Sequence, residues 1–128
     1  MTADKVVDAS VICSLIFAEP DQAVARSMVI RHTGLYAPTL ISFEVANTAL
    51  KKIRARPLER DQIISLYSNF YDFSIQTTDI DLEAAILLAQ REKLSIYDAT
   101  YLWLALDMGI DLVTLDSDLG KAYRRLSP

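Results

Sequence analysis

The sequence predicts an α/β protein in which a parallel sheet is covered on both faces by helices. Short apolar runs typical of buried strands alternate along the chain with longer stretches of helical character. Two of these runs, near the two ends of the chain, finish on aspartate, at Asp8 and Asp116. The hydrophobic fraction of 52% allows a sizeable core in 128 residues.

The first part of the chain is predicted to form two strands and two helices. The first strand covers residues 5–8 and is followed by a short apolar helix over 10–17. Glu19, Pro20 and Asp21 break that helix and begin a second one that ends near Arg31. The second strand covers residues 34–37 and is closed by Pro38, which lacks the N–H that a continuing strand uses.

The remainder is predicted to hold two more strands among helices. Thr39 is positioned to cap a long helix over residues 40–55, and further helices cover 59–70, 79 or 81 to 92, 96–108 and 119–126. Ser95 is the expected N-cap and Gly109 the expected C-cap of the 96–108 helix. The third and fourth strands are expected at 73–76 and 111–115. No repeat or linker interrupts the chain, so residues 1–128 are expected to form one domain.

Composition narrows the class of protein. No apolar run approaches the roughly 20 residues that cross a bilayer, and no signal segment begins the chain, so we expect a cytoplasmic protein that does not enter a membrane. The single Cys13 is expected to be a buried packing residue. The net charge of −4 excludes a polycation, although basic residues gather at 51–60 and 121–125. Each cluster alone is explained by solvated helix ends, and phosphate contact is the alternative.

The two strand-end aspartates predict a site at one edge of the sheet. In parallel α/β sheets, ligands bind beyond the carboxyl ends of the strands, so Asp8 and Asp116 are expected side by side there. Each aspartate also precedes a helix and is equally suited to be an N-cap. Either Asp116 or Asp118 could cap the last helix, which leaves open which of the two belongs to the site.

Two more acids are candidates for the same site. Asp98 lies in a helix that is apolar nearly all round, where a carboxylate is costly unless it is paired or bound to a metal. The alternative is a capping box with Ser95. For the 40–55 helix, periodicity places Phe43, Ala46, Ala49, Leu50 and Ile53 toward the core, and therefore predicts a solvated Glu44 beside Asn47, Thr48 and Lys51.

An all-carboxylate set favours Mg²⁺ or Mn²⁺ over zinc or copper. Such a cation bridges protein carboxylates to phosphates. It also lowers the pKa of a bound water, so that hydroxide forms and can attack a phosphodiester. The four acids Asp8, Glu44, Asp98 and Asp116 therefore predict metal-dependent hydrolysis of a nucleic acid.

Four segments in this order resemble the PIN-domain family, and most closely the VapC-type toxin ribonucleases: VDASVI at 7–12, SFEVAN at 42–47, YDATY at 97–101 and VTLD at 113–116. The resemblance implies a three-layer α/β/α sandwich with a central parallel sheet of four to five strands. It implies a Mg²⁺- or Mn²⁺-dependent endoribonuclease in which Asp8, Glu44, Asp98 and Asp116 are catalytic and hold metal. Ser10, Asn47 and Thr114 match substrate-positioning places, and Asp118 is a possible extra acid. It further implies a homodimer and a small antitoxin partner.

The sequence leaves other functions as alternatives to the nuclease. A PIN-like binding module or scaffold in a nucleic-acid complex, with the acids serving only as caps, is the main alternative. Nucleophilic catalysis needs a base, and the sole His32 is expected at a helix end, where it would cap the helix dipole. Phosphoaspartyl transfer lacks a second aspartate after Asp8-Ala9-Ser10.

Overall fold

The computed structural model describes residues 3–30 and 32–128 of the chain. Its strands are β1 (Ala3–Val7), β2 (His32–Pro38), β3 (Gln76–Thr78) and β4 (Asp111–Val113). They form one sheet in the order β3-β2-β1-β4, and every neighbouring pair is parallel. The sheet therefore brings the ends of β1 and β4, which are far apart in sequence, next to each other.

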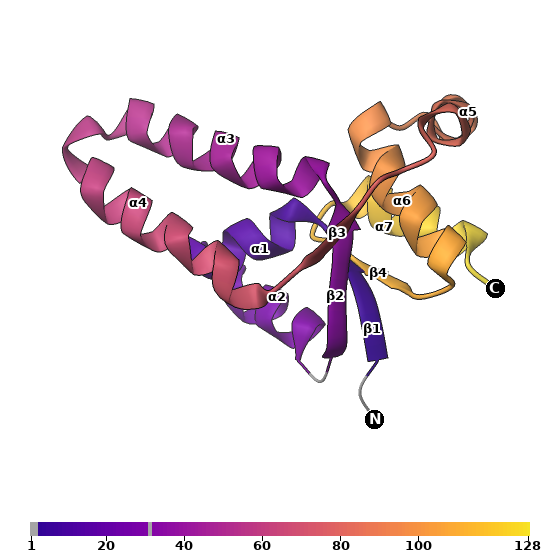
Figure 1. The fold of residues 1–128 in the computed structure, drawn as a ribbon, viewed down its shortest axis with the longest axis horizontal. Coiled ribbons are helices and arrows are strands. Elements are labelled where there is room, and N and C mark those ends of the chain that lie inside the picture. The colour runs from indigo at the N-terminus through magenta and orange to yellow at the C-terminus, as the bar shows by residue number, and fades with distance from the viewer. Residues whose placement is uncertain (1–2, 31) are drawn as a thin grey trace.

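Helices cover the sheet on both sides (Figure 1). One side carries α1 (Ala9–Ile16), α2 (Gln22–Val29), α3 (Leu40–Ala55) and α4 (Arg60–Ser68). The other carries α5 (Leu82–Glu92), α6 (Ile96–Met108) and α7 (Ser117–Leu126), with α6 packed on β1, β2 and β4. This arrangement confirms the predicted three-layer α/β/α sandwich with a parallel sheet.

The central strand β1 explains why the sheet needs both layers. Val6 and Val7 are adjacent in sequence and both are fully buried. Because neighbouring side chains of a strand point to opposite faces, each face of β1 must be covered. Tyr101 and Leu102 of α6 are also fully buried, so this helix covers the sheet at β1, β2 and β4.

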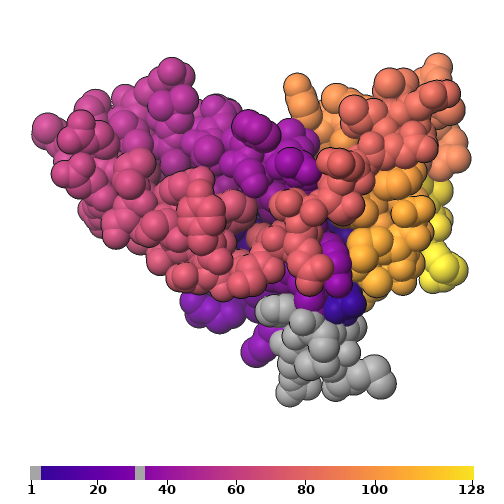
Figure 2. All heavy atoms as spheres, in the orientation of Figure 1, coloured from indigo at the N-terminus to yellow at the C-terminus, as the bar shows by residue number. Residues whose placement is uncertain are grey.

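The hairpin of α3 and α4 projects from the body as a separate lobe (Figures 1 and 2). Two 3₁₀ segments, η1 (Pro57–Glu59) and η2 (Asn69–Phe73), flank α4, so the helix predicted over 59–70 is divided. Ser74 ends η2 in a left-handed conformation with φ 50°. The third strand is consequently not at 73–76 but at Gln76–Thr78.

Several expected helix and strand ends differ. The fourth strand stops at Val113 rather than Leu115, and α7 begins at Ser117 rather than Leu119. The second helix ends at Val29, and Arg31 lies outside the described residues. The expectation that His32 ends a helix is wrong, because its backbone begins β2.

The structure shows some of the predicted helix caps and not others. The side chains of Ser95 and Asp81 accept hydrogen bonds from the backbone N–H groups of Asp98 and Ala84, and Gly109 ends α6 with φ 68°. Thr39 does not cap α3: its backbone is already helical, and its hydroxyl donates instead to the carbonyl oxygen of Thr78 at 3.4 Å.

The predicted orientation of α3 is wrong for Phe43, Ala46 and Leu50, which are exposed, whereas Ala49 is buried and Ile53 packs against the core as expected. Its buried face consists of Ile41, Val45 and Ala49, while Phe43 is 70% exposed and Leu50 is also exposed. The reason is that α3 packs along an i, i+4, i+8 stripe, which the more conspicuous apolar residues flank without joining. Glu44 lies at the edge of this stripe and is therefore half-buried rather than solvated.

No helix in the part of the chain that the structure describes is both long enough and apolar enough to span a membrane.

Candidate active site: an acidic cavity at the carboxyl edge of the sheet

Asp8 follows β1 directly and is only 6% exposed. Its backbone N–H donates to Val113 O of the neighbouring strand at 3.1 Å. The hydroxyls of Ser10 and Thr114 both donate to its Oδ2, at 2.9 and 2.6 Å. Although Asp8 precedes α1, its side chain makes no capping hydrogen bond there. Asp8 is thus a buried carboxylate held from two sides.

The two hydroxyls are themselves fixed by the chain after β4. Ser10 Oγ accepts from the Leu115 N–H at 3.1 Å, and Thr114 Oγ1 accepts from the Asp116 N–H at 3.0 Å. The family resemblance gives Ser10 and Thr114 a role in positioning substrate, whereas their hydrogen bonds in this structure orient Asp8.

Asp116 and Asp98 stand at the starts of two helices. Asp116 is exposed and caps α7 by accepting from the Leu119 N–H at 3.0 Å. Asp98 lies in the first turn of α6, where its N–H donates to Ser95 Oγ at 3.0 Å, as expected for half of a capping box. In each case the capping role coexists with a place in the site.

Glu44 reaches the site from α3. Its Oε1 accepts a hydrogen bond of 2.6 Å from the hydroxyl of Tyr101, a fully buried residue of α6. Tyr101 lies in the core, whereas Tyr97 of the same helix is 57% exposed. The contact of Tyr101 with Glu44 was not predicted. Its signal in the sequence is the spacing of three residues from Asp98, which places both side chains on one face of α6.

One cavity of about 310 Å³ brings the four acids together. Its walls come from the end of β1, from α1, from α3, and from the starts of α6 and α7. The residues that line it are Asp8, Ala9, Ser10, Cys13, Glu44, Asn47, Thr48, Lys51, Asp98 and Asp116. Asp118 is absent from this set and lines the adjacent cavity, so the geometry favours Asp116 as the fourth acid.

Burial and mutual repulsion raise the pKa values of three acids. For Asp8, burial raises the carboxyl pKa, the bonds from Thr114 and Ser10 lower it, and the charge of Asp116 raises it further. Burial is also the main cause for Glu44, whose pKa the neighbouring Asp8 and Asp98 raise again. The pKa of Asp98 is raised by burial and then by Asp116 and Asp8. The cavity therefore concentrates negative charge that nearby cations compensate only in part.

The chemistry of these donors fits a hard divalent cation. The acids are all oxygen donors, which suits Mg²⁺ or Mn²⁺, and a cation would relieve the repulsion that raises their pKa values. Within residues 3–30 and 32–128, however, no three acid, histidine or cysteine side chains converge closely enough to hold one ion as they stand. The cavity groups the carboxylates without focusing them on one point.

Three further residues complete the cavity. Asn47 and Lys51 line it from the exposed side of α3, and Lys51 is the one member of the 51–60 basic cluster that does so. Cys13 is buried, as expected, but it too lines the cavity. Burial raises the pKa of its thiol, and the nearby Asp8 and Glu44 raise it again, so the thiol form is favoured.

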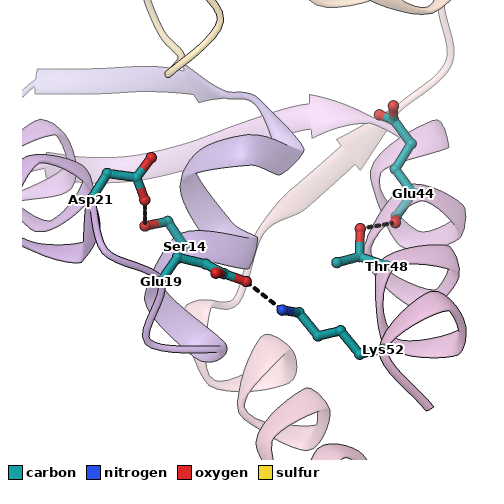
Figure 3. A network of polar contacts seen from close by, with 6 residues as sticks. All are labelled: Ser14, Glu19, Asp21, Glu44, Thr48 and Lys52. Atoms are coloured by element: carbon teal, nitrogen blue, oxygen red, sulfur yellow. Dashed lines mark hydrogen bonds and ion pairs between the residues drawn. The ribbon is translucent and has the colours of Figure 1, made fainter. Parts of the chain in front are cut away.

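A polar network braces the wall between α1 and α3 (Figure 3). Lys52 of α3 bonds to Glu19 at the end of α1, and Ser14 donates to Asp21. Thr48 donates to the backbone carbonyl of Glu44 at 3.1 Å. Lys52 is therefore paired with the connection between α1 and α2 and does not line the cavity.

Comparisons with known proteins agree with this arrangement. The family model described as PIN domain matches residues 5–125. The chain is 30% identical over 125 residues to a protein of Pyrobaculum aerophilum named Ribonuclease VapC3, covering 94% of this chain and 95% of the relative. The solved structure of PAE2754, also from Pyrobaculum aerophilum, aligns with a TM-score of 0.73 and 24% identity over 95% of this chain and 87% of that one, which supports the fold. The chain belongs to the PIN-domain family.

Proposed function

We propose that this chain is a Mg²⁺- or Mn²⁺-dependent endoribonuclease and the toxin of a toxin–antitoxin pair, with residues 1–128 acting as one nuclease domain. The observation that carries the proposal is the cavity in which Asp8, Glu44, Asp98 and Asp116 meet from four different elements. The relative named Ribonuclease VapC3 supports the same reaction class.

In this proposal the four acids hold the cation and the rest of the cavity orients them. A bound divalent ion acidifies water and stabilises the charge that develops on the phosphate. Ser10 and Thr114 keep Asp8 in one orientation, and Tyr101 does the same for Glu44. Lys51 supplies positive charge for an incoming phosphate, and Asn47 supplies an amide donor.

The first experiment measures cleavage of a single-stranded RNA by the purified chain with Mn²⁺, with Mg²⁺ and with EDTA. We expect cleavage only with metal, and we expect the variant Asp98→Asn to have none. Asp107→Asn is a matched control, because Asp107 is an exposed aspartate of the same helix that lies nine residues further along. Equal cleavage by Asp98→Asn and Asp107→Asn would falsify the proposed site.

Calorimetric titration with Mg²⁺ or Mn²⁺ separates the nuclease from a non-catalytic scaffold. If the chain is a metal-dependent nuclease, we expect it to bind the cation and we expect Asp8→Asn to bind it more weakly. An absence of binding at millimolar metal favours a PIN-like module in which the acids serve only as caps.

The proposal includes a homodimer and an antitoxin that blocks the cavity. Exposed apolar side chains of α5, at Leu82, Ile86 and Leu87, support a contact with another protein chain. The molar mass in solution, measured for the chain and for Leu87→Glu, tests the dimer. We expect the variant to shift the chain toward monomer.

A further inference from the structure

A second cavity of about 320 Å³ adjoins the acidic one. The two share Asp98 and Asp116 as a common wall. Beyond that wall the second cavity is lined by three cations, Lys93, Lys121 and Arg125, and by the acids Glu92 and Asp118. A ligand in the acidic cavity therefore has cationic side chains directly beside it.

The local structure directs these cations to one place. Lys93 ends α5 in a left-handed conformation with φ 58°, at the short connection to α6. Lys121 and Arg125 are four residues apart on α7, so they lie on the same side of that helix. Ser95, the N-cap of α6, also lines the cavity, so the positive end of the α6 dipole opens there.

The second cavity also holds four acids, Glu92, Asp98, Asp116 and Asp118, and among the described residues only Asp118 is neither ion-paired nor assigned to the divalent cation. Glu92 is bonded to Arg91 at 2.9 Å and to Arg125 at 3.1 Å, which lowers its carboxyl pKa. Asp98 and Asp116 are the proposed ligands of the divalent cation. Among the residues that the structure describes, neither Lys93 nor Lys121 has an acidic group within 4.0 Å, so both ammonium groups remain available.

A third cavity, of about 540 Å³, gives the contrast. It also borders Asp116, together with Ser10, but its outer wall carries Glu19 and Asp21. Glu19 is paired with Lys52, so Asp21 supplies the remaining negative charge of that wall, whereas Lys93 and Lys121 outnumber Asp118 in the second cavity. A polyanion that crosses the acids is therefore attracted more strongly toward Lys93 and Lys121.

We propose that the cavity of Lys93, Lys121 and Arg125 is a subsite for a backbone phosphate of single-stranded RNA that flanks the bond to be cut. The strand would pass from Lys51, over the four acids, to this subsite. Arg125, which is bonded to Glu92, fixes one wall of this cavity, while Lys93 and Lys121 contact the phosphate. This inference rests on the proposed nuclease function.

The test measures the affinity of a labelled single-stranded RNA for the full chain in Mg²⁺, between 50 and 200 mM salt, in the Asp8→Asn background. Each lysine–phosphate ion pair that a substitution removes should decrease the magnitude of the slope of log K against log salt by about 0.7. We expect Lys93→Gln and Lys121→Gln each to do this, so that the fall in affinity over this fourfold salt range becomes about 2.6-fold smaller. Arg26→Gln is the control, because it removes one charge from an exposed position on α2, across the sheet.

The outcomes separate the inference from the function. If the wild type cuts RNA while both lysine variants keep the slope of Arg26→Gln, the subsite is wrong and the nuclease stands. If Asp8→Asn still cuts RNA, or the wild type neither cuts nor binds it, the proposed function fails and the subsite fails with it. In the wild-type background, the lysine variants should raise KM for RNA with little change in kcat.

Discussion

Asp8 and Asp116 occupy equivalent positions and have opposite environments. Each follows a strand of the same parallel sheet and precedes a helix, and each lines the same cavity. Asp8 is buried, receives two hydroxyl hydrogen bonds and caps nothing. Asp116 is exposed and caps α7.

A strand-end aspartate that caps the following helix contributes to the stability of the fold. One that makes no capping hydrogen bond lowers that stability through its burial. The cap at Asp116 gives that residue a structural purpose without any metal. The burial of Asp8 raises its pKa and disfavours its charged form, and no cap offsets that cost. We therefore expect Asp8 to be the more sensitive position for function, and Asp116 the more sensitive for local stability.

The largest expected effect is the loss of cleavage in Asp8→Asn. The variant keeps the size of the side chain but removes the charge that faces the cation. We expect metal-dependent RNA cleavage to fall to background, measured against wild type at equal concentration. Activity near that of the wild type would mean that Asp8 does not bind the metal and is no more important for function than Asp116.

Thr114→Val tests whether the hydroxyls around Asp8 matter. The valine removes the 2.6 Å donor to Oδ2 and the acceptor for the Asp116 N–H. Loss of such an outer partner of a metal ligand reduces affinity or activity by roughly 10- to 100-fold. Metal titration and cleavage rates measure this, with Thr77→Val on the exposed part of β3 as the control. An effect no larger than that of the control would mean that Asp8 is oriented by other contacts.

Tyr101→Phe tests whether Glu44 depends on a hydroxyl hydrogen bond, as we expect for Asp8. The hydrogen bond from Tyr101 lowers the pKa of Glu44, so its removal should raise that pKa further. We expect the acidic limb of the pH–rate profile to move to higher pH and cleavage at neutral pH to fall severalfold. Tyr71→Phe removes an equivalent hydroxyl from the exposed Tyr67–Tyr71 pair and should leave the profile unchanged.

Asp116→Ala and Asp116→Asn separate the two roles of that residue. Alanine should lower the free energy of unfolding by about 1 kcal/mol, because the cap of α7 is lost, whereas asparagine keeps a comparable cap. Both should impair cleavage if the carboxylate binds metal. Full activity in Asp116→Asn, with the loss instead in Asp118→Asn, would transfer the fourth acid to Asp118.

The smallest expected effect is in the pH dependence of stability without metal. The folded pKa of Asp8 lies above its usual 3.8, so the native state holds this proton more tightly than the unfolded chain does. Stability should therefore fall as pH rises from the unfolded toward the folded pKa of Asp8. Denaturation of wild type and Asp8→Asn in EDTA, from pH 3 upward, should show a larger decrease for wild type than for the variant, in which the raised pKa values of Glu44 and Asp98 still contribute.

The fold was predictable from the sequence where local signals agree with packing. Ser95 and Gly109 mark both ends of α6, and the run Val6-Val7 indicates a strand buried on both faces. The bounds of α3 were predicted correctly, but its buried face and the position of β3 were not. On α3, Phe43 and Leu50 are apolar yet exposed, because helix packing selects the Ile41, Val45 and Ala49 stripe. At β3, the left-handed turn at Ser74 displaces the strand, and serine gives no warning of it.

The candidate site was predictable as a set of residue types but not as a geometry. Topology explains why Asp8 and Asp116 are neighbours, since β1 pairs with β4. The bond from Tyr101 to Glu44 joins residues 57 positions apart and depends on how α3 and α6 pack, whereas the spacing from Asp98 indicates only the face of α6 on which Tyr101 lies. The exclusion of Asp118 from the acidic cavity likewise follows from the cap of α7 at Asp116.

The two donors to Asp8 have a consequence for synthesis of the chain. Thr114 is 106 residues downstream of Asp8, and the backbone N–H that fixes Ser10 belongs to Leu115. A growing chain that lacks β4 can thus hold neither the hydroxyl of Thr114 on Asp8 nor the charge of Asp116 beside it. Because proteins emerge from the ribosome N-terminus first, the acidic cavity is completed only when almost the whole chain has been made. A nascent or truncated copy that ends before β4 would therefore lack the complete acidic cavity.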